Sequence, residues 1–236
     1  MRRKTATMGH QQPVFYEEGQ WELLKQLRKT AADVMYSLRK ARFESYVHGS
    51  LARGDVSKSS DIDIFIPGLV RSFMVELALD EHDITGRKLV QATPGGLAKA
   101  HIYLPGNTMV TFPLVGPTAR ELDFYAFGGQ LGPDRLEDVL HNRVPGVDKR
   151  LMLIEPTPEG HIEMPLSDLP PGSVARKLGV GQDIVEERIR VLNRRASVGI
   201  TGVYLDRLLA PDEGFEAVLA EIAARDSLVR RRVKRR

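Results

Sequence analysis

Apolar residues recur every three or four positions over residues 17–42, which is the longest stretch of this kind in the chain. The spacing predicts an amphipathic helix with one buried face. Residues 44–48 are then expected to form a short strand. Residues 61–66 alternate polar and apolar side chains with a period of two, the pattern of a strand with one buried face. A short helix is expected at residues 69–80.

The middle of the chain predicts several strands, separated by turns that contain proline or glycine. Residues 165–172 contain three prolines and are expected to be a linker. Beyond them the pattern is mainly helical, apart from a strand-like piece at residues 202–205. The chain is therefore expected to be an α+β protein. The strands of the middle region are expected at residues 88–92, 100–104, 109–115, 121–127 and 151–154, with a helical insert at residues 134–141.

Composition agrees with a folded protein, since the 236 residues are 42% hydrophobic and 28% charged. No apolar run reaches the roughly 18 residues that a membrane span needs, and no apolar stretch follows the N-terminal charges. We therefore expect neither a membrane span nor a secretory signal. Cysteine is absent, which excludes disulfides, a thiolate nucleophile and a zinc site with cysteine ligands. The expected compartment is the cytoplasm.

Positive charge is concentrated at the two ends of the chain. The net charge is only +3, but six of the last seven residues are cations, and Arg2, Arg3 and Lys4 lie at the start. Such ends are either solvated or in contact with a polyanion such as nucleic acid. The sign of the charge does not distinguish the two.

Two acidic residues, Asp61 and Asp63, alternate with isoleucines in one predicted strand, so both carboxylates project from the same face. Residues two apart on a strand are about 6–7 Å apart, and two anions at that distance repel each other unless a cation lies between them. Oxygen ligands without histidine or cysteine suit Mg²⁺ or Mn²⁺ better than zinc. The pair is therefore a candidate metal site.

A glycine and a serine, Gly49 and Ser50, follow the preceding strand, where the chain is expected to turn into a short helical segment. Glycine lets the backbone approach an anion closely, serine offers a hydroxyl, and exposed N–H groups favour phosphate. A phosphate site beside a carboxylate pair is the arrangement that metal-assisted phosphoryl chemistry needs.

The run Gly49-Ser50-x-Ala52-Arg53-Gly54, followed after six residues by Asp61-x-Asp63 with Ser60 before it, resembles a known signature. It is similar to that of the DNA polymerase β-type nucleotidyltransferase superfamily, and within it to the minimal nucleotidyltransferases of prokaryotes. The resemblance is close over residues 47–66 and looser over residues 20–127. It implies a mixed β-sheet with flanking helices. It also implies Mg²⁺-dependent transfer of a nucleoside monophosphate from an NTP, expected to be ATP, to a hydroxyl, with release of pyrophosphate.

The resemblance also implies roles for individual residues. Asp61 and Asp63 would hold the metal ions, and a third carboxylate on a neighbouring strand would help to hold the catalytic metal and accept the proton of the hydroxyl. Asp123, in the predicted strand at residues 121–127, is the first candidate, and Glu121 is the alternative. Arg53 either contacts phosphate or braces the loop. The implied nucleotide-binding residues are Gly49, Ser50, Arg53 and Ser60.

A second group of polar residues, Lys149, Arg150 and His161, flanks a predicted strand and either binds the acceptor or serves the fold. Further along, residues 173–192 resemble a helix-turn-helix whose turn lies at Gly179. A small wing could follow at residues 199–205. The second helix carries the candidate nucleic-acid contacts, which are Arg188, Arg190, Arg194 and Arg195.

The start of that second helix holds Gln182, Asp183 and Glu186, and its two carboxylates argue against close contact with phosphate. A helical cap on the catalytic domain, or a dimer surface, is therefore the alternative. We expect a basic arm at residues 1–13, a nucleotidyltransferase domain at 14–165, a small, mainly helical, winged-helix-like domain at 166–229 and a basic tail at 230–236.

The sequence thus predicts a metal-dependent nucleotidyltransferase that uses an NTP. Its acceptor is left open among an RNA end, a protein and a small molecule. The alternative is a nucleic-acid-binding regulator built on an inactive nucleotidyltransferase fold. Nucleic acid is a candidate partner through the helical domain and the basic tail, no membrane partner is expected, and the oligomeric state is not predicted.

Overall fold

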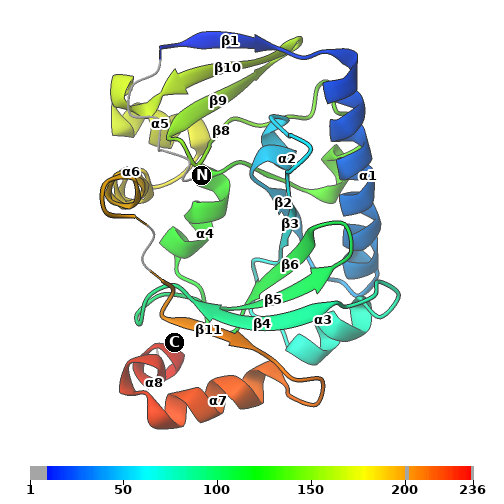
Figure 1. Ribbon diagram of the computed structural model, residues 1–236, viewed down its shortest axis with the longest axis vertical. Helices are drawn as coiled ribbons and strands as arrows, with labels where there is room; N and C mark the ends of the chain where they lie inside the picture. Colours follow the sequence, from blue (N-terminus) through cyan, green and yellow to red (C-terminus); the bar gives the residue numbers. More distant parts are fainter. Residues whose placement is uncertain (1–9, 200–201, 235–236) are drawn as a thin grey trace. The chain divides into compact units, whose positions relative to one another are not determined.

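The computed structural model describes residues 10–199 and 202–234, which form an α+β fold (Figure 1). The chain divides into two compact units, each built from segments that are separate in the sequence. The first unit comprises Met1–Thr30, Val47–Ser60 and Ala119–Thr201, and the second comprises Ala31–Tyr46, Asp61–Thr118 and Gly202–Arg236. These units need not coincide with the domains expected from the sequence, whose boundaries stay a prediction.

The longest helix, α1 (Glu18–Lys40), confirms the helix expected at residues 17–42. Its buried positions follow the expected three- and four-residue spacing, since Leu24, Ala31, Met35 and Leu38 are fully buried. The boundary between the two units lies within this helix.

The first unit contains an antiparallel sheet of four strands in the order β1-β10-β9-β8. In Figure 1, β1 lies along β10. This pairing needs Gly160, because a Cβ at that position would lie 1.9 Å from the backbone oxygen of Val14. The strands are β1 (Gln12–Phe15), β8 (Gly146–Val147), β9 (Met152–Thr157) and β10 (Gly160–Pro165).

A strand pair and four helices complete the first unit. β2 (Tyr46–His48) pairs with β7 (Gln130–Leu131), and the short helix α2 (Ser50–Arg53) follows β2. Helices α4, α5 and α6 enclose a core that includes Phe127, Leu153 and Leu192. The bounds are α4 (Ala119–Phe127), α5 (Pro171–Leu178) and α6 (Gln182–Val198), with 3₁₀ turns at Pro133–Arg135 and Leu166–Asp168.

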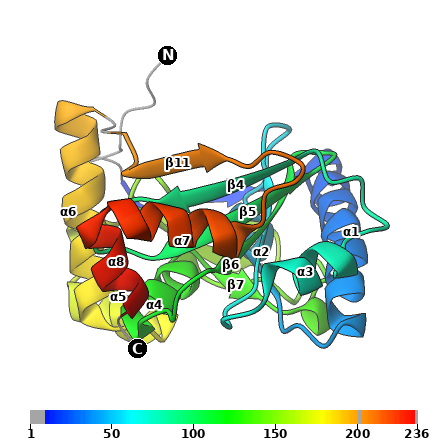
Figure 2. The ribbon, with the colours of Figure 1, turned by 90° about the horizontal axis from the view of Figure 1, so that it is seen from below.

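The second unit contains five strands in the order β11-β4-β5-β6-β3, antiparallel except for the parallel pair β3 and β6. Figure 2 shows α7 and α8 against this sheet, where Phe215 of α7 packs edge-on against Phe112 of β6. The bounds are β3 (Ile62–Phe65), α3 (Ser72–Ala78), β4 (Gly86–Gln91), β5 (Ala98–Leu104), β6 (Thr108–Pro113), β11 (Leu205–Leu208), α7 (Phe215–Arg225) and α8 (Ser227–Lys234).

One expected strand is wrong. Residues 121–127 belong to helix α4, because Phe124 and Phe127 are three apart and pack on the same apolar core when the segment is helical. The alternation of Glu121, Leu122, Asp123 and Phe124 had favoured a strand, and over so few residues the two patterns are hard to distinguish. The other strands expected in the middle of the chain are present with shifted ends. The helical insert expected at residues 134–141 is reduced to the 3₁₀ turn at Pro133–Arg135, and the strand expected at residues 202–205 begins only at Leu205.

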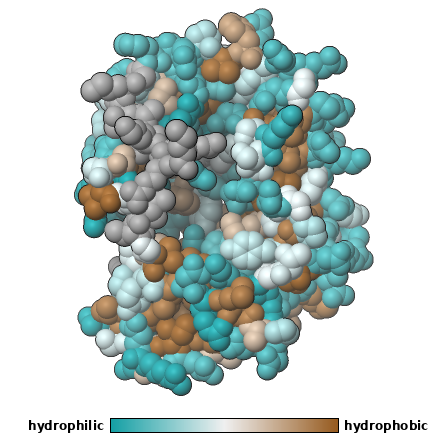
Figure 3. Space-filling view, viewed as in Figure 1, coloured by the Kyte–Doolittle hydropathy of each residue, from teal (hydrophilic) through white to brown (hydrophobic). Residues whose placement is uncertain are grey.

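Most surface residues on the face drawn in Figure 3 are hydrophilic, with apolar residues in small groups. No helix among residues 10–199 and 202–234 has the length and apolar character that a membrane span requires.

Candidate active site

The predicted Gly-Ser turn lies between β2 and α2 in the first unit. Gly49 has a φ of 76° and a ψ of −138°, a conformation that favours glycine, and its backbone N–H donates to the oxygen of Gly129 at 2.9 Å. This sharp turn starts α2 directly after the strand. Ser50 is therefore the first helical residue, as the sequence predicts.

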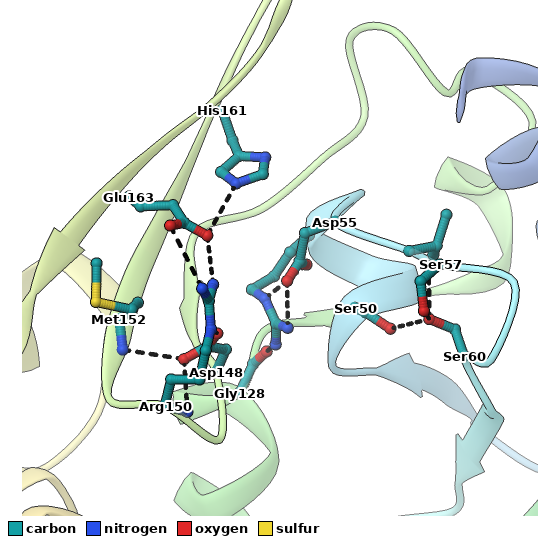
Figure 4. A network of polar contacts seen from close by, with 12 residues as sticks. Ser50, Asp55, Ser57, Ser60, Gly128, Asp148, Arg150, Met152, His161 and Glu163 are labelled. Atoms are coloured by element: carbon teal, nitrogen blue, oxygen red, sulfur yellow. Dashed lines mark hydrogen bonds and ion pairs between the residues drawn. The ribbon is translucent and has the colours of Figure 1, made fainter. Parts of the chain in front are cut away.

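Serine hydroxyls lie around the loop that follows α2, and Figure 4 labels Ser50, Ser57 and Ser60. The Ser50 hydroxyl lies 3.5 Å from that of Ser60, which also accepts the backbone N–H of Ser57 at 2.8 Å. The hydroxyls of Ser57 and Ser59 lie 3.1 Å apart. The loop thus brings together Ser50 and Ser60, two of the residues expected to bind nucleotide.

Arg53 braces this loop. Its guanidinium donates to both carboxylate oxygens of Asp55 at 2.9 Å and to the backbone oxygen of Gly128 at 2.6 Å. The side chain is only 6% exposed. Of the two roles expected for Arg53, the structure thus contains the contacts of a brace, whereas phosphate contact stays a prediction.

The predicted carboxylate pair lies at the start of β3 in the second unit. Ile62 and Ile64 are buried on one side of the strand, whereas Asp61 is exposed and Asp63 is half-buried. Both acids occupy positions that alternate with these isoleucines, which is the arrangement for side chains on the opposite face of the sheet, and their role in metal binding stays a prediction. Mg²⁺ is commonly bound through one or two carboxylates together with water and substrate phosphates. This donor set therefore fits a magnesium ion.

The face that carries the acids continues across the neighbouring strands. In register, Asp63 lies beside Met109 of β6, and Met109 lies opposite Tyr103 of β5. One pair further along, Thr111 lies opposite His101. These positions of β5 and β6 hold no carboxylate, and no group of three or more metal-binding side chains occurs in the part of the chain that the structure describes.

One family model matches this part of the chain. Residues 28–89 match the model of the nucleotidyltransferase domain. The matched residues include the Gly49–Ser50 turn and the Asp61–Asp63 pair. Neither the curated proteins nor the solved structures contain a significant match. The nucleotidyltransferase match supports a transferase that moves a nucleotidyl group, and it leaves the acceptor undefined.

Within the matched residues, Arg28 is a buried brace that the sequence analysis missed. Its side chain is 1% exposed and donates to the backbone oxygens of Leu51, Ala52 and Asn142 at 3.0, 3.2 and 2.9 Å. Burial lowers the pKa of its guanidinium to about 10. Its spacing in the sequence could have revealed it. Arg28 lies four residues after Leu24 and three before Ala31, which places it on the apolar face of α1.

On the same face of the sheet as Asp63, His101 is a second buried polar residue. The Thr111 hydroxyl lies 2.9 Å from its Nδ1. Burial, aided by the charges of Lys99 and Lys88, lowers the pKa of His101 to about 3. The imidazole is therefore neutral at physiological pH.

Asp123, the expected third carboxylate, lies on helix α4 and not on a strand. Its Oδ2 accepts the backbone N–H of Gly181 at 2.9 Å, directly before α6. Glu121 was expected to project from the same side of a strand as Asp123. On a helix this is wrong, because residues two apart project about 200° apart. The role of Asp123 in metal binding thus loses the strand on which it was argued, and it stays a prediction.

The candidate nucleic-acid contacts lie on α6, where Arg190, Arg194 and Arg195 are exposed and Arg188 lies 5.0 Å over the ring of Phe124. Two cations of the basic tail are used within the fold. Arg230 donates to the Ala223 oxygen, and Arg232, 4% exposed, donates to that of Gly116. The N-terminal cations and the last two arginines lie outside the described residues.

Proposed function

We propose that the protein is a metal-dependent nucleotidyltransferase that transfers a nucleoside monophosphate from an NTP, expected to be ATP, to a hydroxyl. The observation that carries this proposal is the carboxylate pair, with Asp61 directly before β3 and Asp63 within it, among the residues that match a nucleotidyltransferase domain.

In this proposal Asp61 and Asp63 hold the metal, and the hydroxyls of Ser50 and Ser60 donate to phosphate oxygens. Bound Mg²⁺ would neutralise the triphosphate and stabilise charge in the transition state. Arg53 acts indirectly, because it holds the loop through Asp55 and Gly128.

The transfer itself is a substitution at the α-phosphorus. The acceptor oxygen forms a bond to the α-phosphorus, and the bond between that phosphorus and the oxygen bridging to the β-phosphate breaks. The electron pair leaves with pyrophosphate, and the proton of the hydroxyl passes to an aspartate carboxylate. Catalysis of this kind depends on positioning and charge stabilisation and needs no covalent enzyme intermediate.

The test compares transfer of label from two forms of the donor. The protein is incubated with Mg²⁺ and ATP labelled at either the α- or the γ-phosphate, together with RNA, protein or small-molecule acceptors. We expect label from the α-position only. Asp61→Asn and Asp63→Asn should each lower the rate by about 10³-fold or more, since several kcal/mol of charge stabilisation is lost.

The matched control is Asp33→Asn, which removes an exposed carboxylate of α1 and should leave the rate unchanged. Label that follows the γ-phosphate, or equal rates in the wild type and both variants, would contradict the proposal. An absence of any labelled product, together with salt-sensitive binding of RNA or DNA, would favour the inactive nucleic-acid-binding regulator.

A further inference from the structure

A cavity of about 660 Å³ lies in the first unit, beside the loop that follows α2. Its walls come from β1, the first turns of α1, residues 55–58 and β10. The volume is within the range of small-molecule sites, about 300–1,000 Å³. Ser57 connects the cavity to the candidate active site, because its backbone N–H donates to Ser60, whose hydroxyl lies near that of Ser50.

The cavity wall contains a buried histidine, one nitrogen of which makes only a long polar contact. His161 is 4% exposed, and the Tyr16 hydroxyl lies 2.7 Å from its Nδ1. Burial raises the pKa of Tyr16, so the phenol stays protonated and can donate to Nδ1. Nε2 makes no hydrogen bond of ordinary geometry among the described residues, and its ion-pair contact with Oε1 of Glu163 is long, at 3.5 Å. A buried polar atom with so long a contact retains bonding capacity that water or a ligand can use.

A fixed carboxylate lies next to this nitrogen (Figure 4). Glu163 is 6% exposed, and its Oε1 lies 3.5 Å from Nε2 of His161. Arg150 and Gln12 both donate to Glu163. Burial by itself would raise the pKa of this carboxyl, but the hydrogen bonds hold it below its usual value. An N–H donor beside an ionised acceptor suits a hydroxyl, which can accept from one and donate to the other.

The charges that line the cavity are nearly balanced. Three acids (Glu17, Asp55 and Glu163) and two bases (Lys58 and Arg150) line it, and Arg53 pairs with Asp55 from outside the lining, so no excess of positive charge faces the cavity. This balance argues against a polyanion such as RNA. Phe15 lines the cavity with a ring that is 68% exposed. An exposed aromatic ring offers a flat apolar surface on which the C–H face of a sugar ring can pack.

We propose that this cavity binds a small neutral molecule with several hydroxyl groups, of the size of a mono- or disaccharide, and that this molecule is the acceptor. The second part rests on the proposed nucleotidyl transfer. The sequence analysis gave Lys149, Arg150 and His161 as residues that either bind the acceptor or serve the fold. Of these, Arg150 and His161 line the cavity and Lys149 does not.

The binding test uses saturation-transfer NMR on the full chain with D-glucose, maltose and myo-inositol as probes. We expect a signal from at least one probe. Phe15→Ala should weaken its binding about fivefold, which is the loss of one aromatic contact. Glu163→Gln should abolish the signal. The matched control is Phe73→Ala, because Phe73 of α3 is 65% exposed and lies outside the cavity.

No signal from any probe, or equal signals from the wild type and Phe15→Ala, would overturn the binding site. Because Phe15 is exposed, Phe15→Ala should still fold, so its comparison with the wild type tests the site even if Glu163→Gln does not fold.

A second arm separates this inference from the proposed function. The probe that binds is offered as acceptor with ATP labelled at the α-phosphate, and we expect the label on the sugar. Binding without labelled sugar would refute its role as acceptor. Labelled RNA or peptide without sugar binding would refute the cavity proposal while supporting nucleotidyl transfer.

Discussion

Charged residues serve opposite purposes in two segments that adjoin in the sequence. Around the loop at α2, Arg28 of α1 and Arg53 of α2 are buried and donate to backbone oxygens or to Asp55. At the start of β3, Asp61 is exposed and Asp63 is half-buried on the polar face of the sheet. The first segment uses ionic groups to hold a backbone shape, whereas the second, in our proposal, presents them to a metal ion.

This difference shows that the type of a charged residue says little about its role. A buried guanidinium that donates to three carbonyl groups stabilises a loop, because a buried carbonyl without a partner is costly. Of the three carbonyls that Arg28 bonds, that of Ala52 also accepts the backbone N–H of Val144. Two carboxylates on one face of a strand repel each other, and a bound cation relieves that repulsion. The position of each charge relative to the apolar core therefore separates the two roles.

The largest expected effect comes from the loop side of the comparison. Arg28→Ala should lower the free energy of unfolding by about 4 kcal/mol, because it leaves buried carbonyls unsatisfied and opens a cavity. Urea unfolding measures the loss. The neighbouring Lys29→Ala is the control, since Lys29 is exposed and should change stability by less than about 0.5 kcal/mol. Equal unfolding midpoints for the two variants would show that Arg28 is not a brace.

The sequence predicts those parts of the fold that depend on local patterns and misses those that depend on long-range packing. The Gly49 turn, the long helix and the alternation around Asp61 and Asp63 are local patterns, so they could be predicted. The pairing of β1 with β10 joins residues about 150 positions apart and depends on Gly160, which no local pattern reveals.

The candidate site was predicted incompletely for a related reason. A charged residue in an amphipathic helix is ordinarily assigned to the solvent side, which hides a buried brace such as Arg28. The cavity depends on His161 and Glu163 of β10 and on Tyr16, in the segment that joins β1 to α1, and the sequence did not indicate that β1 pairs with β10. Short segments such as residues 121–127 fit a strand or a helix equally well until their packing is known.

A smaller effect on stability is expected for His101, which lies on the same face of the sheet as Asp63. The folded protein keeps its imidazole neutral down to about pH 3, whereas the unfolded chain takes up a proton near pH 6.5. Stability should therefore fall as the pH is lowered from 6.5 toward 3, and the contribution of His101 reaches about 2 kcal/mol at pH 5.

The measurement is urea unfolding at pH 7.5 and pH 5 for the wild type and His101→Gln. The variant should lose less stability on acidification, by about 2 kcal/mol. His10→Gln, at an exposed position, should behave like the wild type. If His101→Gln and the wild type lose the same stability, this face of the sheet accepts a positive charge and the contrast with the braced loop is weaker.

The smallest effect is expected for Asp123. This residue accepts a structural hydrogen bond, and it is also the predicted third metal ligand. Asp123→Asn keeps an oxygen that can accept the N–H of Gly181 but removes the negative charge. Because Asp123 lies on α4 and joins it to the start of α6, we expect a stability change of less than about 1 kcal/mol, and the rate of transfer tests its predicted metal role: an unchanged rate would leave Asp123 with a structural role only. Asp123→Ala should lose about 1 kcal/mol with the hydrogen bond. A rate as low as that of Asp63→Asn would instead make Asp123 a metal ligand, since only a group that holds the metal requires the charge itself.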